Sequence, residues 1–280
     1  MTTTTPSSLS RRYALKMVAA GAGVALVGSA WPTNAAHAAA PSNESGADLA
    51  GWNLAVGDGI WTGPGQSPVG QADIALTHTG TMSELAANVQ RRGVMAHAIA
   101  FRRYFDLHRL SLRHTAELEF RLPDLPTTSN WEYNAQTLEI GLFVWDGPDT
   151  RLDHGMAIQW VLNPWVPELG EIRAWSMTEQ GPVWLPVGSL APDTAWHRLY
   201  VDYKPGSGLA RLEVDGHRID VAETLTPKAA HWGTTIDARL QAEIVSVWPG
   251  SNPSVPAHRA EFRNWAWTTT PGISLPDGMV

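Results

Sequence analysis

The stretch that decides the fold covers residues 196–216 and reads WHRLYVDY, then KPGSG, then LARLEVDG. Apolar and polar residues alternate in both outer parts, which indicates two half-buried strands. The proline and glycines between them favour a turn, and Asp215-Gly216 is a second tight turn of the type that needs positive φ. The expected buried positions are Leu199, Val201 and Tyr203 in the first strand and Ala210, Leu212 and Val214 in the second.

The same alternation recurs on both sides of this hairpin, interrupted by clusters of Gly, Pro, Asn and Asp. Its clearest example is residues 115–122, where Ala116, Leu118 and Phe120 share one face. Residues 83–92 fit either a helix or a strand, and we favour a strand. The pattern predicts a single all-β domain, an antiparallel β-sandwich without internal repeats. The other expected strands are 137–145, 156–162, 171–177, 217–221, 240–248 and 259–267.

One pattern in the hairpin is specific enough to suggest a family. The order W-H-x-L-x-V-D-Y, then G-x-x-x-L-x-V-D-G, resembles the paired central strands of concanavalin A-like sandwiches, which include laminin-G-like domains and laminarinase-type glucanases. Residues 261–267 (EFRNWAW) resemble the last strand of that fold. The resemblance implies a concanavalin A-like jelly roll over residues 51–268, with sugar held on the concave face of one curved sheet.

The first 38 residues have the features of an export signal. Arg11 and Arg12 precede an apolar run over residues 17–30, and Ala36-His37-Ala38 is a small-residue cleavage pattern. The arginine pair resembles a twin-arginine signal, which implies transport in folded form by the bacterial twin-arginine export machinery. The run is too short to span a bilayer, so we expect an extracytoplasmic protein with no stable membrane span after cleavage. Residues 39–50 are expected to be a linker and residues 269–280 a C-terminal tail.

Composition excludes several function classes. After removal of residues 1–38, 17 basic residues face 27 acidic ones, a net charge of −10, which argues against nucleic acid as a partner. The chain has no cysteine, so disulfides, cysteine zinc sites and thiol nucleophiles are excluded.

Fourteen tryptophans are unusual for 280 residues and suggest surfaces that stack on sugar rings. Strand parity places several of them with charged residues rather than with the aliphatic core. We therefore predict a glycan-binding face, although covering loops or a one-residue register error would bury the same residues. Its expected members are Glu139, Trp145, Gln159, Arg173, Trp175 and Trp265.

Catalytic residues are less clearly marked. Glu117 and Glu119 lie at i and i+2 on one strand, about 6–7 Å apart, a spacing within the range of glycosidase carboxylates. Laminarinase-type glucanases carry E-x-D-x-x-E, whereas Leu122 stands at the final position here. Glu117, Glu119 and Glu139 are therefore the weak catalytic candidates, and a solvated acidic strand is the alternative.

A turn-rich connection offers a candidate calcium site. Asp146, Asp149 and Asp153 lie close together in sequence, and calcium prefers several carboxylate oxygens. Concanavalin-like folds often carry a structural Ca²⁺, so the resemblance supports the same expectation.

The sequence leads to three functional hypotheses. The first is a secreted, non-catalytic carbohydrate-binding protein whose partner is a polysaccharide or other glycan. The second is a polysaccharide-degrading hydrolase or lyase. The third is an adhesive or structural envelope protein.

Overall fold

The computed structural model describes residues 42–57, 60–89, 92–104, 112–125, 135–145, 154–178, 181–204, 209–219, 236–248 and 258–271. Its elements are β1 (Ser42–Gly46), β2 (Asn53–Val56), the short 3₁₀ helix η1 (Gln71–Asp73), β3 (Ile74–His78), β4 (Ser83–Ala87), β5 (Arg92–Tyr104), β6 (Leu112–Arg121), β7 (Ala135–Trp145), β8 (His154–Val161), β9 (Glu171–Thr178), β10 (Gly181–Ser189), β11 (His197–Lys204), β12 (Leu209–Val214), β13 (His217–Ile219), β14 (Ile236–Trp248) and β15 (His258–Pro271).

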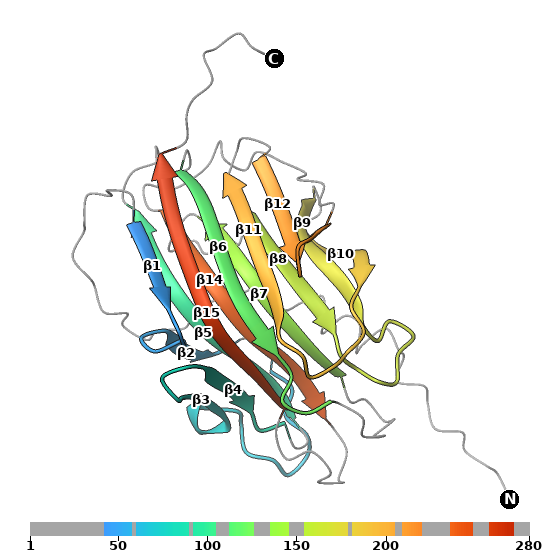
Figure 1. Cartoon of the computed structure of the whole chain (residues 1–280). Helices are drawn as coiled ribbons and strands as arrows, with labels where there is room; N and C mark the ends of the chain where they lie inside the picture. Colours follow the sequence, from blue (N-terminus) through green and yellow to red (C-terminus); the bar gives the residue numbers. More distant parts are fainter. Residues whose placement is uncertain are drawn as a thin grey trace, which may run out of the picture.

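These strands form two antiparallel sheets, which lie one in front of the other in Figure 1. Sheet A has the order β13-β12-β11-β6-β15-β4-β3, and β1 adds to β15 beside β4. Sheet B has the order β10-β9-β8-β7-β14-β5-β2. The predicted fold class, an all-β antiparallel sandwich, is confirmed.

The core lies between the sheets and consists of the inward side chains of both. Trp160 of β8 shows how the two layers interlock. Its ring meets Phe120 of β6 edge-on at 6.0 Å and His197 of β11 at 5.6 Å. The indole Nε1 donates to Leu190 O at 2.8 Å, so this fully buried residue leaves no polar atom unpaired. Burial of such large side chains is the main term that stabilises the sandwich.

The hairpin predicted from residues 196–216 is confirmed. Leu199 lies opposite Val214 and Val201 opposite Leu212, all of them buried. At the second turn Asp215 has a φ of 52° and Gly216 a φ of 76°, the positive values that the Asp-Gly pair predicted.

The turn at Asp215 is also fixed by its side chain. The Asp215 carboxylate accepts from the backbone N–H of Arg198 at 2.8 Å and contacts His197 Nδ1 at 2.8 Å. His197 Nε2 lies 3.0 Å from an oxygen of Asp193. The histidine and aspartate at the two ends of the hairpin pattern therefore bind each other, which explains why both occur in it.

Some boundaries differ from the sequence prediction. Residues 42–46, expected to be linker, form β1 and pair with β15, and Thr268 Oγ1 donates to Asn43 Oδ1 at 3.0 Å. The segment SNESG has little intrinsic preference for a strand, so pairing with β15 overrides propensity. The last strand extends through Pro271, three residues into the expected tail. Residues 83–87 form a strand, as favoured.

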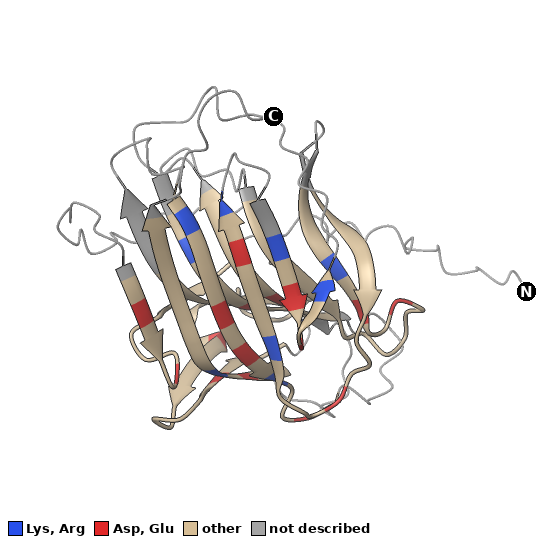
Figure 2. Ribbon diagram, turned by 45° about the horizontal axis from the view of Figure 1, so that its top comes forward, with Lys and Arg blue, Asp and Glu red and all other residues tan. Residues whose placement is uncertain are grey.

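The outer face of sheet A carries ion pairs, most of them between neighbouring strands, with one within β12 and one to Asp124, which follows β6. Figure 2 shows the basic and acidic positions interleaved along this sheet. Most of the arginines involved are substantially exposed, so each pair contributes little, about 0–1 kcal/mol. The pairs are Arg113–Asp202, Arg198–Glu117, Arg263–Glu119, Arg121–Glu261, Arg211–Glu213 and Arg259–Asp124. Within the described segments, no helix is long and apolar enough to cross a membrane.

Candidate functional site

Five polar side chains cross the outer face of sheet B in one line, and we call them the polar row. His97 on β5 lies opposite Glu243 on β14, and Glu243 lies opposite Glu139 on β7. Glu139 lies opposite Gln159 on β8, which lies opposite Arg173 on β9. Residues in register on neighbouring antiparallel strands project from the same face. The row therefore places two carboxyl groups, an imidazole, an amide and a guanidinium side by side.

Hydrogen bonds connect much of the polar row. Gln159 Nε2 donates to Glu139 Oε1 at 2.6 Å. On the neighbouring strand, His97 Nδ1 and the amide Nε2 of Gln241 both approach Glu243 Oε2 at 2.6 Å. Gln241 lies on the same face as Glu243, two residues before it on β14. The two glutamates, although adjacent, are thus bound by different partners.

The row is closed at one end and more open at the other. His97 and Glu243 are only 2% and 1% exposed, whereas the side chain of Arg173 is 14% exposed. Arg173 Nε forms an ion pair with Glu171, whose side chain is 23% exposed. A molecule approaching this face would meet Arg173 and Glu171 first.

Several buried polar atoms in and beside the row lack a hydrogen-bond partner among the described residues. They are His97 Nε2, Gln159 Oε1, Gln241 Oε1 and Glu243 Oε1. Leaving one such group unsatisfied costs about 1–3 kcal/mol. Native proteins seldom retain several of them together, so ordered water or a bound ligand is expected to supply the missing partners.

Glu139 is electrostatically distinct from an ordinary glutamate. Burial raises its pKa well above the usual value, and the neighbouring charge of Glu243 raises it further. The hydrogen bond from Gln159 acts in the opposite direction but does not cancel these effects. Glu139 therefore keeps its proton to a higher pH than a solvated glutamate and can act as a hydrogen-bond donor.

The structure brings three of the predicted ligand residues together: Glu139, Gln159 and Arg173 belong to the polar row. Trp175 lies on the same sheet but is only 3% exposed. Its ring meets Phe143 edge-on at 5.5 Å and Trp184 of β10 at 5.2 Å. It therefore packs in a small aromatic cluster on this face, apart from the core, and does not present a free indole surface. Trp145 is opposite Asp237 in register, and its side chain lies outside the described part.

The predicted position of Trp265 is wrong. It lies on sheet A, is 8% exposed, and packs edge-on against Trp52 at 5.2 Å. Its Nε1 donates to Asp48 O at 2.7 Å. The cause is a β-bulge between Arg263 and Ala266, where Asn264 has a φ of 50°. The extra residue reverses the alternation of faces after it, so Trp265 and Trp267 point into the core.

The weak catalytic candidates are divided between the two sheets. Glu117 and Glu119 lie on the outer face of sheet A, away from Glu139. Glu117 pairs with Arg198, and Glu119 accepts from Arg263 Nε at 2.6 Å. These contacts agree with the solvated acidic strand considered as an alternative.

The candidate calcium ligands Asp146, Asp149 and Asp153 and the export residues Arg11 and Arg12 lie outside the described residues. Among the side chains that are described, no group of three or more His, Asp or Glu could hold a metal ion.

Sequence reasoning missed His97, Gln241 and Glu243. Their signal is a polar residue at alternate positions between apolar ones, as in MAHAI (residues 95–99) and RLQAEI (residues 239–244). Alanine is a weak marker of strands, so the sequence does not predict β5, which carries His97. Gln241 and Glu243 lie within the expected strand 240–248, but the sequence does not show which strands lie beside it. The strand partners that place these residues beside Glu139 are set by the tertiary fold.

No protein-family model and no curated protein sequence matches the chain. Among solved structures, it is similar to a glycoside hydrolase family 16 endo-glucanase from Bacteroides ovatus, with a TM-score of 0.45, 8% identity and 78% and 94% of the two chains covered. A PL7 alginate lyase from Zobellia galactanivorans has a TM-score of 0.39, 13% identity and coverages of 74% and 85%. A galectin-like protein of unknown function from Bacillus subtilis has a TM-score of 0.43, 9% identity and coverages of 78% and 89%. Likenesses at this level transfer no activity to this chain.

Proposed function

We propose that this chain is a carbohydrate-binding protein that holds a polysaccharide on the outer face of sheet B. We further propose that residues 1–38 direct it out of the bacterial cytoplasm in folded form. The observation that carries the binding proposal is the polar row with its unpartnered acceptor atoms. Sugar hydroxyls both donate and accept hydrogen bonds, so one ligand class suits both the Arg173 guanidinium at the open end of the row and the acceptor Gln159 Oε1 beside it.

Retention on polysaccharides tests this proposal. The full chain is incubated with insoluble and soluble polysaccharides, and the bound fraction is measured by sedimentation and by retardation in gels. We expect Arg173→Ala to weaken retention about tenfold, the loss of about 1.4 kcal/mol. Arg259→Ala is the matched control, because Arg259 is an exposed, ion-paired arginine on sheet A. Equal retention by the two variants would contradict the assignment of the polar row.

Glu139→Gln gives a second prediction with two readouts of opposite sign. At pH 7 the folded wild-type protein must either keep a proton on Glu139 or bury a charged carboxylate, and both lower its free energy of unfolding. Glutamine has no charge, so the variant avoids this loss of stability. We expect the variant to be more stable at pH 7 by at least about 1 kcal/mol, and this gain to shrink toward pH 4.5 because the unfolded glutamate is then protonated as well. Retention on the polysaccharide should fall in the same variant.

Urea unfolding at several pH values and the retention assay measure the two effects. A gain in stability without loss of retention would indicate a buried glutamate that has no part in binding. Loss of both would indicate damage to the fold.

A polysaccharide-degrading hydrolase or lyase is the second candidate, and the two glutamates of the row favour it. Glu139 has the raised pKa that a general acid needs, and the neighbouring Glu243 carboxylate is held by His97. Carboxyl groups whose environments differ in this way can serve as acid and base in glycoside cleavage.

Release of reducing ends or of unsaturated sugars, assayed in the retention samples, distinguishes this function. Product that disappears in Glu139→Gln while retention persists would establish an enzyme. Retention without product supports the binding protein. If no glycan is retained and none is cleaved, the envelope-protein hypothesis is favoured.

A further inference from the structure

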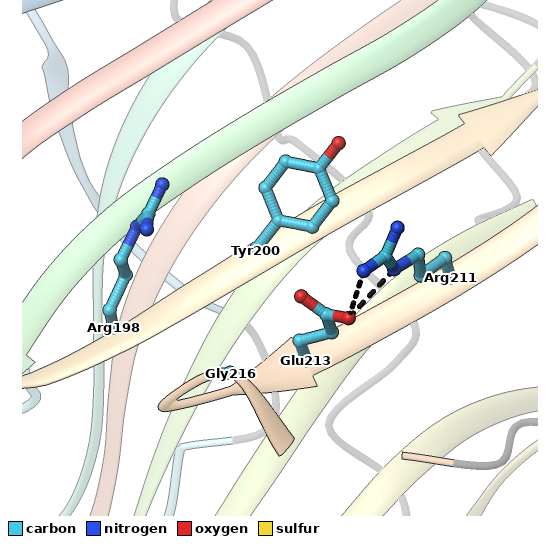
Figure 3. Close-up of a pocket in the computed structure, with 5 residues that line it drawn as sticks. All are labelled: Arg198, Tyr200, Arg211, Glu213 and Gly216. Carbon is cyan, nitrogen blue, oxygen red and sulfur yellow. Dashed lines mark hydrogen bonds and ion pairs between the residues drawn. The ribbon is translucent and has the colours of Figure 1, made fainter. Parts of the chain in front are cut away.

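A second candidate ligand site lies on the opposite side of the sandwich, on the outer face of sheet A. A hollow of about 270 Å³ is lined by Arg198 and Tyr200 of β11, Arg211 and Glu213 of β12, and Gly216 in the following turn. Figure 3 shows the Tyr200 ring between the two arginines, with Glu213 beside it. This volume is at the small end of ligand pockets, so the hollow suits one ring better than a long segment of chain.

Charged groups surround the Tyr200 ring on every strand that touches it. In register, Tyr200 lies opposite Glu117 of β6 and opposite Glu213 of β12. Glu117 pairs with Arg198, and Glu213 accepts from Arg211 Nε at 2.7 Å. The Arg211 guanidinium lies over one part of the Tyr200 ring, with its carbon 5.7 Å from the ring centre, so a ligand stacked on this ring shares it with Arg211 or displaces the arginine. The Tyr200 ring therefore lies among two hydrogen-bond donors, Arg198 and Arg211, and two acceptors, Glu117 and Glu213. The two positive and two negative charges sum to zero.

We propose that this hollow binds one residue of a neutral sugar, stacked on Tyr200 and hydrogen-bonded by Arg198, Arg211 and Glu213. A pyranose ring has an apolar face that fits an aromatic ring and a rim of hydroxyls that fits the charged groups. Each arginine keeps free N–H groups beyond those used in its ion pair. An acidic sugar would have to displace a carboxylate, whereas a neutral one adds to the existing pairs.

The side chains can adapt to a ligand at little cost. Arg198 and Arg211 are 58% and 50% exposed, so their ion pairs are weak and can be rearranged. The Tyr200 hydroxyl is held in its protonated form, because partial burial and the charge of Asp202 raise its pKa. It can therefore donate a hydrogen bond throughout the neutral range. None of these residues belongs to the polar row, so this site is independent of the proposed function.

Tyrosine-selective NMR tests the proposal directly, because the chain has only five tyrosines. The full chain carrying ¹³C-labelled tyrosine is titrated with cellohexaose and, separately, with mannohexaose. The Tyr200→Phe variant identifies the Tyr200 signal. We expect this signal to shift with at least one hexasaccharide and to saturate. Tyr203, on the same strand but buried at 1% exposure, serves as the internal reference that does not shift.

Variants separate this site from the polar row. Tyr200→Ala should weaken binding at the hollow at least about tenfold, measured on the signals of ¹⁵N-labelled Arg198 and Arg211 backbone amides. The Tyr200 shift should persist in Arg173→Ala, so failure of the polar row and failure of this site are distinguishable. A Tyr200 signal unmoved by both hexasaccharides would overturn the proposal. A third titration uses hexagalacturonate, an acidic hexasaccharide. A shift with it alone would overturn the assignment to a neutral sugar.

Discussion

Replacing Trp160 with alanine is expected to lower the free energy of unfolding by about 4 kcal/mol, within the range of buried Trp→Ala substitutions. The side chain is fully buried and lies between the two sheets, against Phe120 and His197. Its removal leaves a cavity in the core between the two sheets. It also leaves Leu190 O without the donor that it has in the wild-type protein. Urea unfolding followed by far-ultraviolet circular dichroism measures the change.

Trp165→Ala is the matched control, because Trp165 is 40% exposed in the connection that follows β8. Its effect should stay within about 0.5 kcal/mol. Trp160→Phe should lie between the two, since it keeps an aromatic ring but loses the indole N–H. If Trp160→Ala cost no more than Trp165→Ala, the interlocking of the two sheets through this residue would be refuted.

The second large effect concerns pH and His258. This histidine begins β15, is 4% exposed, and has a pKa lowered to about 4 because burial penalises its charged form. In the unfolded chain its pKa is about 6.5. Between these values the unfolded state binds more protons than the folded state. Stability is therefore unaffected by His258 above pH 6.5 and falls as the pH drops from 6.5 to 4, by about 3 kcal/mol in total.

The variant His258→Leu isolates this contribution. Its free energy of unfolding, relative to that of the wild-type protein, should rise by about 3 kcal/mol between pH 7 and pH 4. The comparison with wild type is necessary because Glu139 acts in the opposite direction: its raised pKa makes the protein lose stability as the pH rises above 4.5. A difference between variant and wild type that does not change with pH would show that the pKa of His258 is not lowered in the folded protein.

The sequence predicted the sandwich well because its strongest signal, period-two alternation, is local. The hairpin around Asp215-Gly216 needs only neighbouring residues to be recognised, and it was placed correctly. Alternation along each strand also predicts that Glu139, Gln159 and Arg173 point to the same face, and the structure places them in register there. It failed at Trp265, where Asn264 adds one residue to the strand and reverses the parity. No local pattern marks that bulge in advance.

The candidate site could be predicted only in part for a related reason. The local sequence around Glu139 does not show which strand pairs with the strand that contains it. Its neighbour Glu243 comes from β14, about one hundred residues later, and His97 comes from a strand too rich in alanine to be expected. The raised pKa of Glu139 depends on that neighbour and on burial, and both are properties of the assembled fold.

The position of β15 has a consequence for how the chain acquires its fold. Among the described strands this one comes last in the chain, yet it lies in the interior of sheet A, between β6 on one side and β4 and β1 on the other. Until β15 is available, the other strands of sheet A are divided into three groups with unpaired edges: β13-β12-β11-β6, β4-β3, and β1 alone. Folding must wait for contacts across more than 200 residues, such as Thr268 with Asn43. Such a chain folds slowly and late. A nascent chain that stops before residue 258 would have a gap in the middle of its sheet rather than a shortened edge.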